Sequence, residues 1–331
     1  MTSKYNDIII KLYLVIANRF KNMILKGYGT MTLQQLKYLV TVAEYKNITL
    51  AAEKLYISQP SLSSSIHSLE KEMNVTAFVR SNKGMTVTKE GEELLSYARN
   101  LLEQADIMRD KFCTDTNRKP KFCVSCQHYS FAVNAFVDVV QKYDASEYNF
   151  TLRETQTGEI IDDVASGNSE LGILYLSESN EEVLQKLFKK NDLVFEEIFE
   201  ASPHIFISKN HPLAEKEKIN LEELKPYPYL VYEQGERNSF YFSEEFLSVL
   251  DMPKSIEVRD RATLFNLAIG LNGFTVSSGV IDNKLNGEDI VARPLDMNCS
   301  MHIGIIKKKN IMLSRYADTY IQALKKHLPI G

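Results

Sequence analysis

The stretch from Asn47 to Met73 constrains the fold most strongly, because its pattern predicts two short helices separated by a brief break. Asn47 is a good N-cap for the first helix, which carries three apolar residues on one side: Ala51, Ala52 and Leu55. Ser58 is the expected N-cap of the second helix, and Pro60 lies in its first turn, where a missing N–H costs nothing. The pattern therefore predicts a helix-turn-helix.

A helix before this stretch and a pair of strands after it complete the predicted unit. The preceding helix has one apolar face: Leu36, Leu39, Val40 and Ala43. Val75–Arg80 and Met85–Thr88 have the composition of two short strands, and Ser81–Gly84 has that of a tight turn between them. This hairpin, with Arg80 and Lys83, predicts the wing of a winged helix-turn-helix.

The second helix of the motif has one face that packs and one that is presented. Its apolar residues fall in a narrow arc at about 100° per residue: Leu62, Ile66, Leu69 and Met73. The opposite side is polar or small: Pro60, Ser64, His67, Ser68 and Lys71. An amphipathic helix alone is typical of an ordinary surface helix. The close-packing alanines, the short turn and the wing together favour a helix that binds DNA.

One long helix is predicted after the wing. From Lys89 to about Phe112, apolar residues recur at alternating steps of four and three, the spacing of a coiled-coil seam: Leu94, Ala98, Leu101, Ala105, Met108 and Phe112. Such a seam requires a partner helix. A helix that links two globular parts favours a second copy of the chain as that partner, with a partner in the same chain as the alternative. We therefore predict a dimerisation helix over residues 89–113.

The second half of the chain has a different pattern. Residues 114–120 contain no apolar side chain and end in proline, which predicts a hinge. Beyond it, strands alternate with helices, which predicts an α/β domain over residues 121–331 with parallel strands. The predicted strands are Phe122–Ser125, Phe150–Glu154, Leu171–Leu176, Ala201–Ser208, Tyr229–Tyr232, Phe274–Ser277 and Met301–Ile306. The predicted helices among them are Phe131–Tyr143 and Glu159–Ser166.

Charge and cysteine content support this division. Residues 1–120 carry 17 Lys and Arg against 12 Asp and Glu (+5), whereas residues 121–331 carry 22 against 31 (−9), within a total of −4 over 331 residues. A basic front half suits phosphate binding, because neutralising phosphates releases counterions. The cysteines are too few and too unevenly placed for a secreted disulfide scaffold: Cys113, Cys123, Cys126 and Cys299. A reducing cytoplasm is the expected setting.

Residues 1–30 are expected to be an extension of unknown role, with a natural start at Met31 as the alternative. The apolar run from Ile8 to Ala17 is interrupted by Lys11 and covers about ten residues, against the roughly 20 that a membrane-spanning helix needs. No small-residue cleavage site leads from it into a secreted domain. We therefore expect no membrane association.

These motifs resemble those of the LysR-type transcriptional regulators. The resemblance rests on six runs in and around the helix-turn-helix: Asn47–Leu55, Ile57–Ser63, Ile66, Leu69–Glu70, Ala77–Arg80 and Val87–Gly91. It continues more faintly in Gly167–Gly172, a small-residue turn before a strand, and in His211–Leu213. The resemblance implies an α+β multidomain regulator without enzymatic activity or cofactor. Such a protein binds an interrupted inverted repeat in double-stranded DNA as a homodimer or homotetramer, and acts through DNA bending or contact with RNA polymerase.

Carried over residue by residue, the resemblance implies a set of DNA contacts on the second helix and the wing. The candidates are Gln59, Ser61, Ser63, Ser64, His67, Arg80 and Lys83. Hydroxyl and amide groups suit base edges and nearby phosphates, and Arg80 suits the backbone beside the wing. Several positions depart from the basic residues that the family often has there: Leu50, Ser64, His67 and Ser68. His67 adds a positive charge only when it is protonated.

The resemblance also implies an effector-binding domain of two lobes, similar to type 2 periplasmic binding proteins. Lobe I would comprise about 121–194 and 302–331, and lobe II about 195–301, with crossings near Leu193–Glu197 and Asn298–Ile303. Ligands in such folds bind at strand ends and helix N-termini. The candidate contacts are Ser125, Gln127, His128, Thr157, Tyr232 and Ser277. A small carboxylate or an amino acid is the expected effector.

Two alternatives use the second domain differently: a solute-binding receptor, and a thiol-based redox sensor built on Cys123 and Cys126. The C-x-x-C spacing falls on a predicted strand, where residues three apart point to opposite faces. No second Cys/His pair offers metal ligands, so no metal is expected. The sequence contains no GxSxG, HExxH, Walker or GxGxxG motif. The paired glutamates Glu196-Glu197 and Glu244-Glu245 are expected to be solvated surface residues.

Overall fold

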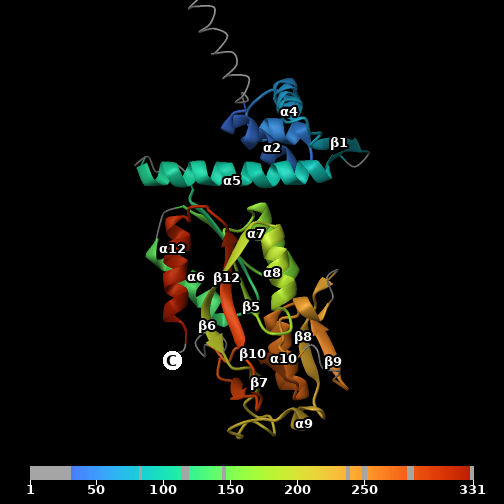
Figure 1. Cartoon of the computed structure of the whole chain (residues 1–331), viewed down its shortest axis with the longest axis vertical. Helices are drawn as coiled ribbons and strands as arrows, with labels where there is room; N and C mark the ends of the chain where they lie inside the picture. Colours follow the sequence, from blue (N-terminus) through green and yellow to red (C-terminus); the bar gives the residue numbers. More distant parts are fainter. Residues whose placement is uncertain are drawn as a thin grey trace, which may run out of the picture. The chain divides into compact units, whose positions relative to one another are not determined.

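The computed structural model of the chain describes residues 31–81, 84–112, 119–143, 147–235, 239–247, 252–281 and 287–328 (Figure 1). Residues 1–30, Lys83, Cys113 and most of the predicted hinge lie outside the described residues. The chain divides into two compact units after Ala105, and each is described by itself.

The first unit begins with the three predicted helices. They are α2 (Leu33–Tyr45), α3 (Ile48–Lys54) and α4 (Gln59–Met73). The predicted caps are confirmed: the side chain of Asn47 accepts hydrogen bonds from the backbone N–H groups of Thr49 (2.9 Å) and Leu50 (3.2 Å). The Ser58 hydroxyl accepts from the backbone N–H of Ser61 at 3.3 Å. A helix N-terminus leaves N–H groups without partners, so these side chains fix where α3 and α4 begin.

The three helices share one core, whose fully buried members include Leu36, Leu39, Ala51, Ala52, Leu62, Ile66 and Leu69. The predicted wing is present as the antiparallel hairpin of β1 (Phe78–Ser81) and β2 (Gly84–Val87). The Glu70 carboxylate on α4 accepts hydrogen bonds from the backbone N–H groups of Ala77 (2.8 Å) and Phe78 (3.2 Å). This contact fixes the wing to α4.

Helix α5 (Lys89–Phe112) has the predicted bounds, but its predicted seam divides into two parts. Ala98 and Leu95, a residue outside the predicted seam, are fully buried in the core of the first unit. Leu101 and Met108 are 46% and 54% exposed. The seam therefore has a partner within the chain for its first part, and an exposed apolar surface further along.

The first lobe of the second unit is built on a five-stranded sheet in the order β4-β3-β5-β12-β6 (Figure 1). Its strands are β3 (Lys121–Cys126), β4 (Asn149–Glu154), β5 (Leu171–Leu176), β6 (Leu193–Ala201) and β12 (Met301–Lys308). β3 pairs in parallel with β4 and β5, as predicted. β12 pairs antiparallel with both β5 and β6, so the prediction of parallel strands is wrong for this part of the sheet. The reason is that β12 returns from the second lobe in the opposite direction.

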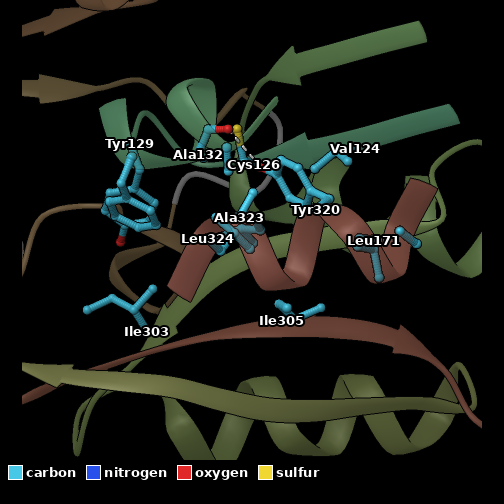
Figure 2. Close-up of a cluster of buried hydrophobic side chains, with 14 of the residues drawn as sticks. Val124, Cys126, Tyr129, Ala132, Leu171, Ile303, Ile305, Tyr320, Ala323 and Leu324 are labelled. Atoms are coloured by element: carbon cyan, nitrogen blue, oxygen red, sulfur yellow. Dashed lines mark hydrogen bonds between the residues drawn. The ribbon is translucent and has the colours of Figure 1, made fainter. Parts of the chain in front are cut away.

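Helices cover both faces of this sheet: α6 (Ser130–Lys142), α7 (Thr157–Ser166), α8 (Glu181–Lys190) and α12 (Arg315–Lys326). α6 and α12 pack on one face, where Tyr320, Ala323 and Leu324 lie against Val124 and Ile305 (Figure 2). α7 and α8 cover the other face through a separate buried cluster. Because both faces are covered, β5 is buried along its whole length.

The second lobe contains the remaining elements. An antiparallel sheet joins β10 (Thr275–Ser277), β7 (His204–Ser208) and β11 (Ile290–Pro294), so the prediction of parallel strands is wrong here as well. A parallel pair joins β8 (Tyr229–Tyr232) to β9 (Ser255–Val258). The helical elements here are α9 (Leu221–Leu224), the 3-10 turn η2 (Phe240–Phe242) and α10 (Arg261–Leu271).

The crossing between lobes occurs later than predicted. β6 pairs with β12 in the first lobe as far as Ala201, so the first crossing lies at 202–203 and not at Leu193–Glu197. The predicted strand Ala201–Ser208 is correspondingly two elements, the end of β6 and the whole of β7. The cause is the length of β6, because its pairing with β12 continues over Leu193–Ala201 and extends the first sheet beyond the expected boundary.

Gly91 at the start of α5 lies against the wing so closely that a Cβ atom there would overlap the backbone carbonyl of Ala77. We expect Gly91→Ala to destabilise the first unit by about 1–3 kcal/mol, because backbone atoms cannot move aside as a side chain can. Gly270→Ala on α10 is the matched control, since a Cβ there has no neighbour within 4 Å. It should be neutral or stabilise by up to about 1 kcal/mol. Denaturant unfolding followed by circular dichroism measures both, and equal effects would contradict the packing argument.

Candidate functional site

The exposed face of α4 brings most of the predicted DNA-contacting residues together in the first unit. Ser61, Ser64 and His67 are exposed, and Arg80 is exposed on β1. Lys83 lies outside the described residues.

Gln59 and Ser63 on α4 are half-buried and hydrogen-bonded to each other, with the Gln59 amide donating to the Ser63 hydroxyl at 2.7 Å. Both groups can exchange this bond for one to a base or phosphate oxygen without leaving a buried polar atom unpaired. The face as a whole is rich in hydroxyls and poor in charge.

The second unit contains a cavity between its two lobes. The first lobe contributes residues at the start of α6, and the second lobe contributes β8, α10, β10 and the segment after η2. Its polar lining residues include His128, Tyr232, Glu244, Glu245, Arg261 and Thr275. Aromatic and aliphatic side chains complete the wall. This combination of an apolar wall and a few convergent polar groups is typical of a small-molecule site.

The structure places three of the six predicted effector contacts at this cavity: His128, Tyr232 and Ser277. The ring of His128 from the first lobe stacks on that of Tyr232 from the second, with centroids 3.8 Å apart. The other three lie elsewhere, which corrects the prediction. Ser125, Gln127 and Thr157 are at most 1% exposed and do not line the cavity.

Ser125 belongs to a buried polar network behind the cavity. Its hydroxyl donates to Asp163 at 2.7 Å and lies 2.7 Å from the Ser169 hydroxyl, while Arg153 donates to Asp163 at 2.6 Å. These bonds join β3 to α7. The strand alternation turns Ser125 away from the cleft, although it follows an apolar run as a ligand-binding residue would.

Thr157 forms part of the contact between the lobes, and Gln127 binds it from within the first lobe. The Gln127 amide donates to the Thr157 hydroxyl at 2.7 Å, and the backbone N–H of Thr157 donates to the side chain of Gln234 in the second lobe at 3.2 Å. Their polar groups are therefore occupied within the protein.

Glu244 and Glu245 line the cavity, so the prediction that they are solvated surface residues is wrong. They are only 6% and 1% exposed. One carboxylate oxygen of Glu244 accepts hydrogen bonds from the backbone N–H of His128 (3.0 Å) and contacts its Nδ1 (2.8 Å). Glu245 accepts from the backbone N–H of Tyr232 (2.8 Å) and from the Ser243 hydroxyl (3.0 Å). No periodic pattern marks these two residues, because they follow a short 3-10 turn and not a regular element.

Burial shifts the protonation equilibria of this cluster. Burial first, and then repulsion from Glu244, raise the pKa of Glu245 to about 8. Burial alone would lower the pKa of His128, but the charge and hydrogen bond of Glu244 outweigh it and raise the pKa. Burial raises the pKa of Glu154, against the opposing attraction of Arg261. His128 and Glu245 both line the cavity, and shifted groups in one cavity mark it as a candidate binding site.

Three buried polar atoms at the cavity have no hydrogen-bond partner among the described residues: Glu244 Oε1, Arg261 Nη1 and Thr275 Oγ1. Leaving a buried donor or acceptor unpaired costs about 1–3 kcal/mol. A bound molecule with complementary groups would remove that cost. The cavity therefore presents one negative group, one positive group and one hydroxyl to a ligand.

The C-x-x-C pair has the predicted strand placement on β3. The sulfur of Cys123 lies 3.0 Å from the Ser169 hydroxyl, whereas Cys126 is fully buried. Burial raises the pKa of Cys126 well above its usual range, which disfavours the reactive thiolate. Among the described residues, no group of three or more His, Cys, Asp or Glu side chains could hold a metal ion. Within the same part of the chain, every helix is too short or too polar to cross a membrane.

Comparison with known proteins agrees with this architecture. Residues 33–92 match the family described as bacterial regulatory helix-turn-helix protein, lysR family, and residues 127–329 match the LysR substrate binding domain. A probable RuBisCO transcriptional regulator of Trieres chinensis is 24% identical over 88% of this chain and 96% of its own length.

Two solved structures show the same fold. A full-length OxyR from Pseudomonas aeruginosa has a TM-score of 0.66 at 20% identity, covering 90% of this chain and 96% of its own. A full-length CbnR complexed with its target DNA has a TM-score of 0.54 at 16% identity, covering 90% and 100%. A winged helix-turn-helix followed by a two-lobed effector-binding domain defines a DNA-binding transcriptional regulator. This chain belongs to the LysR family, as its motifs predicted.

The raised pKa of Glu245 predicts a pH-dependent stability. A carboxyl group whose pKa rises to about 8 on folding stabilises the protein fully below its unfolded pKa, and loses this contribution as the pH rises toward 8. Between pH 5 and 8 the wild type should therefore lose stability relative to Glu245→Gln, by at most about 1.4 kcal/mol per pH unit. Urea unfolding at four pH values measures the difference. The exposed Glu197→Gln should follow the wild type at every pH, and a Glu245→Gln curve parallel to the wild type would refute the assignment.

Proposed function

We propose that this regulator binds an interrupted inverted repeat in DNA as a homo-oligomer, and that a small molecule in the cavity between the lobes modulates its action. The observation that carries this proposal is the set of unpaired buried polar atoms at the cavity, in a chain that also presents an exposed helical face for DNA. A protein of this kind acts where the DNA is, so we place it in the cytoplasm.

The proposed DNA contacts are those predicted from the sequence: Gln59, Ser61, Ser63, Ser64, His67, Arg80 and Lys83. Support comes from the exposure of Ser61, Ser64 and His67 on α4 and of Arg80 on β1, and from the fold shared with CbnR, which has been solved with its target DNA. In this division of roles, Gln59 and Ser63 read base edges and Arg80 binds a phosphate. Because the face of α4 is poor in charge, the wing supplies much of the affinity.

The roles of Gln59 and Arg80 predict different effects in binding experiments. On an operator selected from random duplexes, Gln59→Ala or Ser63→Ala should reduce discrimination between related sites by about 1–3 kcal/mol, because base contacts are lost. Arg80→Ala should weaken binding to all sequences alike and lower the salt dependence by about one phosphate contact. Fluorescence anisotropy at several salt concentrations measures both. Arg259→Ala, an exposed arginine of the second unit, is the control, and uniform losses for all four variants would contradict this division of roles.

The proposed dimer surface is the exposed side of α5. Tyr97, Leu101 and Met108 are 59%, 46% and 54% exposed. At about 100° per residue, the three side chains fall within roughly 40° of one another. An exposed apolar stripe of this kind is stabilised when a second helix covers it. A second copy of the chain supplies that helix, and the resulting pair of wings matches an inverted repeat.

Charges placed on this stripe should separate the subunits. Leu101→Glu with Met108→Glu would bury two carboxylates in the helix pair, so we expect sedimentation as a single 37.9 kDa chain while the wild type sediments at twice that mass or more. Leu271→Glu on α10 is the matched control, because Leu271 is 49% exposed on another helix. A double variant that keeps the wild-type mass would exclude α5 as the dimer surface.

The proposed modulation acts through the contact between the lobes. Glu244 binds His128, and Arg261 of the second lobe pairs with Glu154 of the first at 2.8 Å. A ligand that binds among these groups competes with such bonds or completes them, and so changes how the lobes are held. In the oligomer, that change would alter the spacing of the DNA-binding units, and with it DNA bending or contact with RNA polymerase.

A further inference from the structure

We propose that the ligand of the inter-lobe cavity is a small zwitterion, with a protonated amine at Glu244 and a carboxylate at Arg261, the chemistry of a free amino acid. This inference rests on the proposed function, because it takes the cavity to be the effector site. It goes further by assigning a charge to each end of the ligand.

The acidic side of the cavity calls for a nitrogen cation. Oε2 of Glu244 is occupied by His128, while Oε1 of the same carboxylate is buried without a partner among the described residues. Glu245 adds a second buried carboxyl group beside it. A protonated amine donates up to three hydrogen bonds and offsets negative charge, which suits this end of the cavity.

The basic side calls for an anion. The Nη2 atom of Arg261 pairs with Glu154, while its Nη1 atom is buried and has no hydrogen-bond partner in the described part of the chain. Thr275 is only 4% exposed, and its hydroxyl also has no hydrogen-bond partner among the described residues. A carboxylate accepts from a guanidinium and a hydroxyl together, using both of its oxygens.

The two sides together exclude ligands with charge of one sign. A dicarboxylate would place an anion against the carboxylate of Glu244, where burial makes repulsion costly. A simple amine would leave Arg261 Nη1 unpaired. A zwitterion satisfies both ends, and the apolar wall, which includes Phe206, Phe265 and Ile281, suits a short apolar side chain.

Calorimetric titration of the full-length protein with each of the twenty free L-amino acids tests the proposal. The strongest binder is then compared with its decarboxylated amine and with its deaminated acid. We expect each analogue to bind at least tenfold more weakly, because each leaves one buried group unpaired. An analogue that binds as tightly as the parent amino acid would overturn the proposal. So would the absence of binding by all twenty amino acids at concentrations of about 10 mM, which would detect a dissociation constant of about 1 mM.

Variants assign the two ends separately. Glu244→Gln should weaken the amino acid at least tenfold but leave the deaminated acid unaffected, and Arg261→Gln should weaken the amino acid but leave the amine unaffected. Glu197→Gln is the matched control for Glu244, because Glu197 also contacts a histidine, His302 at 3.1 Å, but on the exposed surface. It should bind as the wild type does. Thermal unfolding without ligand checks that each variant is folded. If a variant does not fold, the comparison of analogues on the wild type still tests the proposal. If one variant lost affinity equally for the amine and for the deaminated acid, the proposed orientation of the ligand would be wrong.

Operator binding separates this inference from the proposed function. An amino acid that binds with the expected analogue pattern but leaves operator binding and transcription unchanged would refute the proposed modulation and support the zwitterion site. A nitrogen-free carboxylate that binds in the cavity and changes operator binding would support the modulation and refute the zwitterion.

Discussion

The arrangement of the second unit depends on polar contacts between its lobes, and the contact of Glu244 with His128 is one of them. It joins the two lobes at the wall of the cavity, where both side chains are only 5% exposed. A buried pair of this kind repays little of its desolvation cost, so it contributes less to stability than to the choice of one geometry. An apolar core holds each lobe together, whereas hydrogen bonds and ion pairs hold the two lobes to each other. Polar groups of another molecule can replace such bonds. The proposed ligand would change the second kind of contact without disturbing the first.

The elements that were predicted correctly from the sequence are those determined by local chemistry. The caps at Asn47 and Ser58 involve residues two or three positions apart, so their signal is complete within a short window. The hairpin of the wing follows from local strand and turn composition, and the bounds of α5 follow from periodicity. The strand β5 was also located correctly, because complete burial leaves an uninterrupted apolar run.

What the sequence could not supply depends on contacts between distant residues. Glu244 contacts His128, which lies 116 positions away in the sequence. The adjacent glutamates Glu244-Glu245 are buried, whereas the identical dipeptide Glu196-Glu197 is exposed. Ser125 and His128 lie three residues apart, yet one joins a buried network and the other lines the cavity. The antiparallel direction of β12 was missed for the same reason, since it is set by the path of the chain through the second lobe.

The position of β12 also has a consequence for the order in which the protein folds during synthesis. β12 lies between β5 and β6 in the sheet, although more than ninety residues of the second lobe separate β12 from β6 in the sequence. Until Met301–Lys308 has left the ribosome, β6 has no strand beside it in this sheet and β5 is paired only with β3, so an open edge of each is available to other strands. The lobe whose synthesis begins first is thus completed last. A ribosome that stalls shortly before this strand would release a chain with an intact DNA-binding unit and an unfinished sensor.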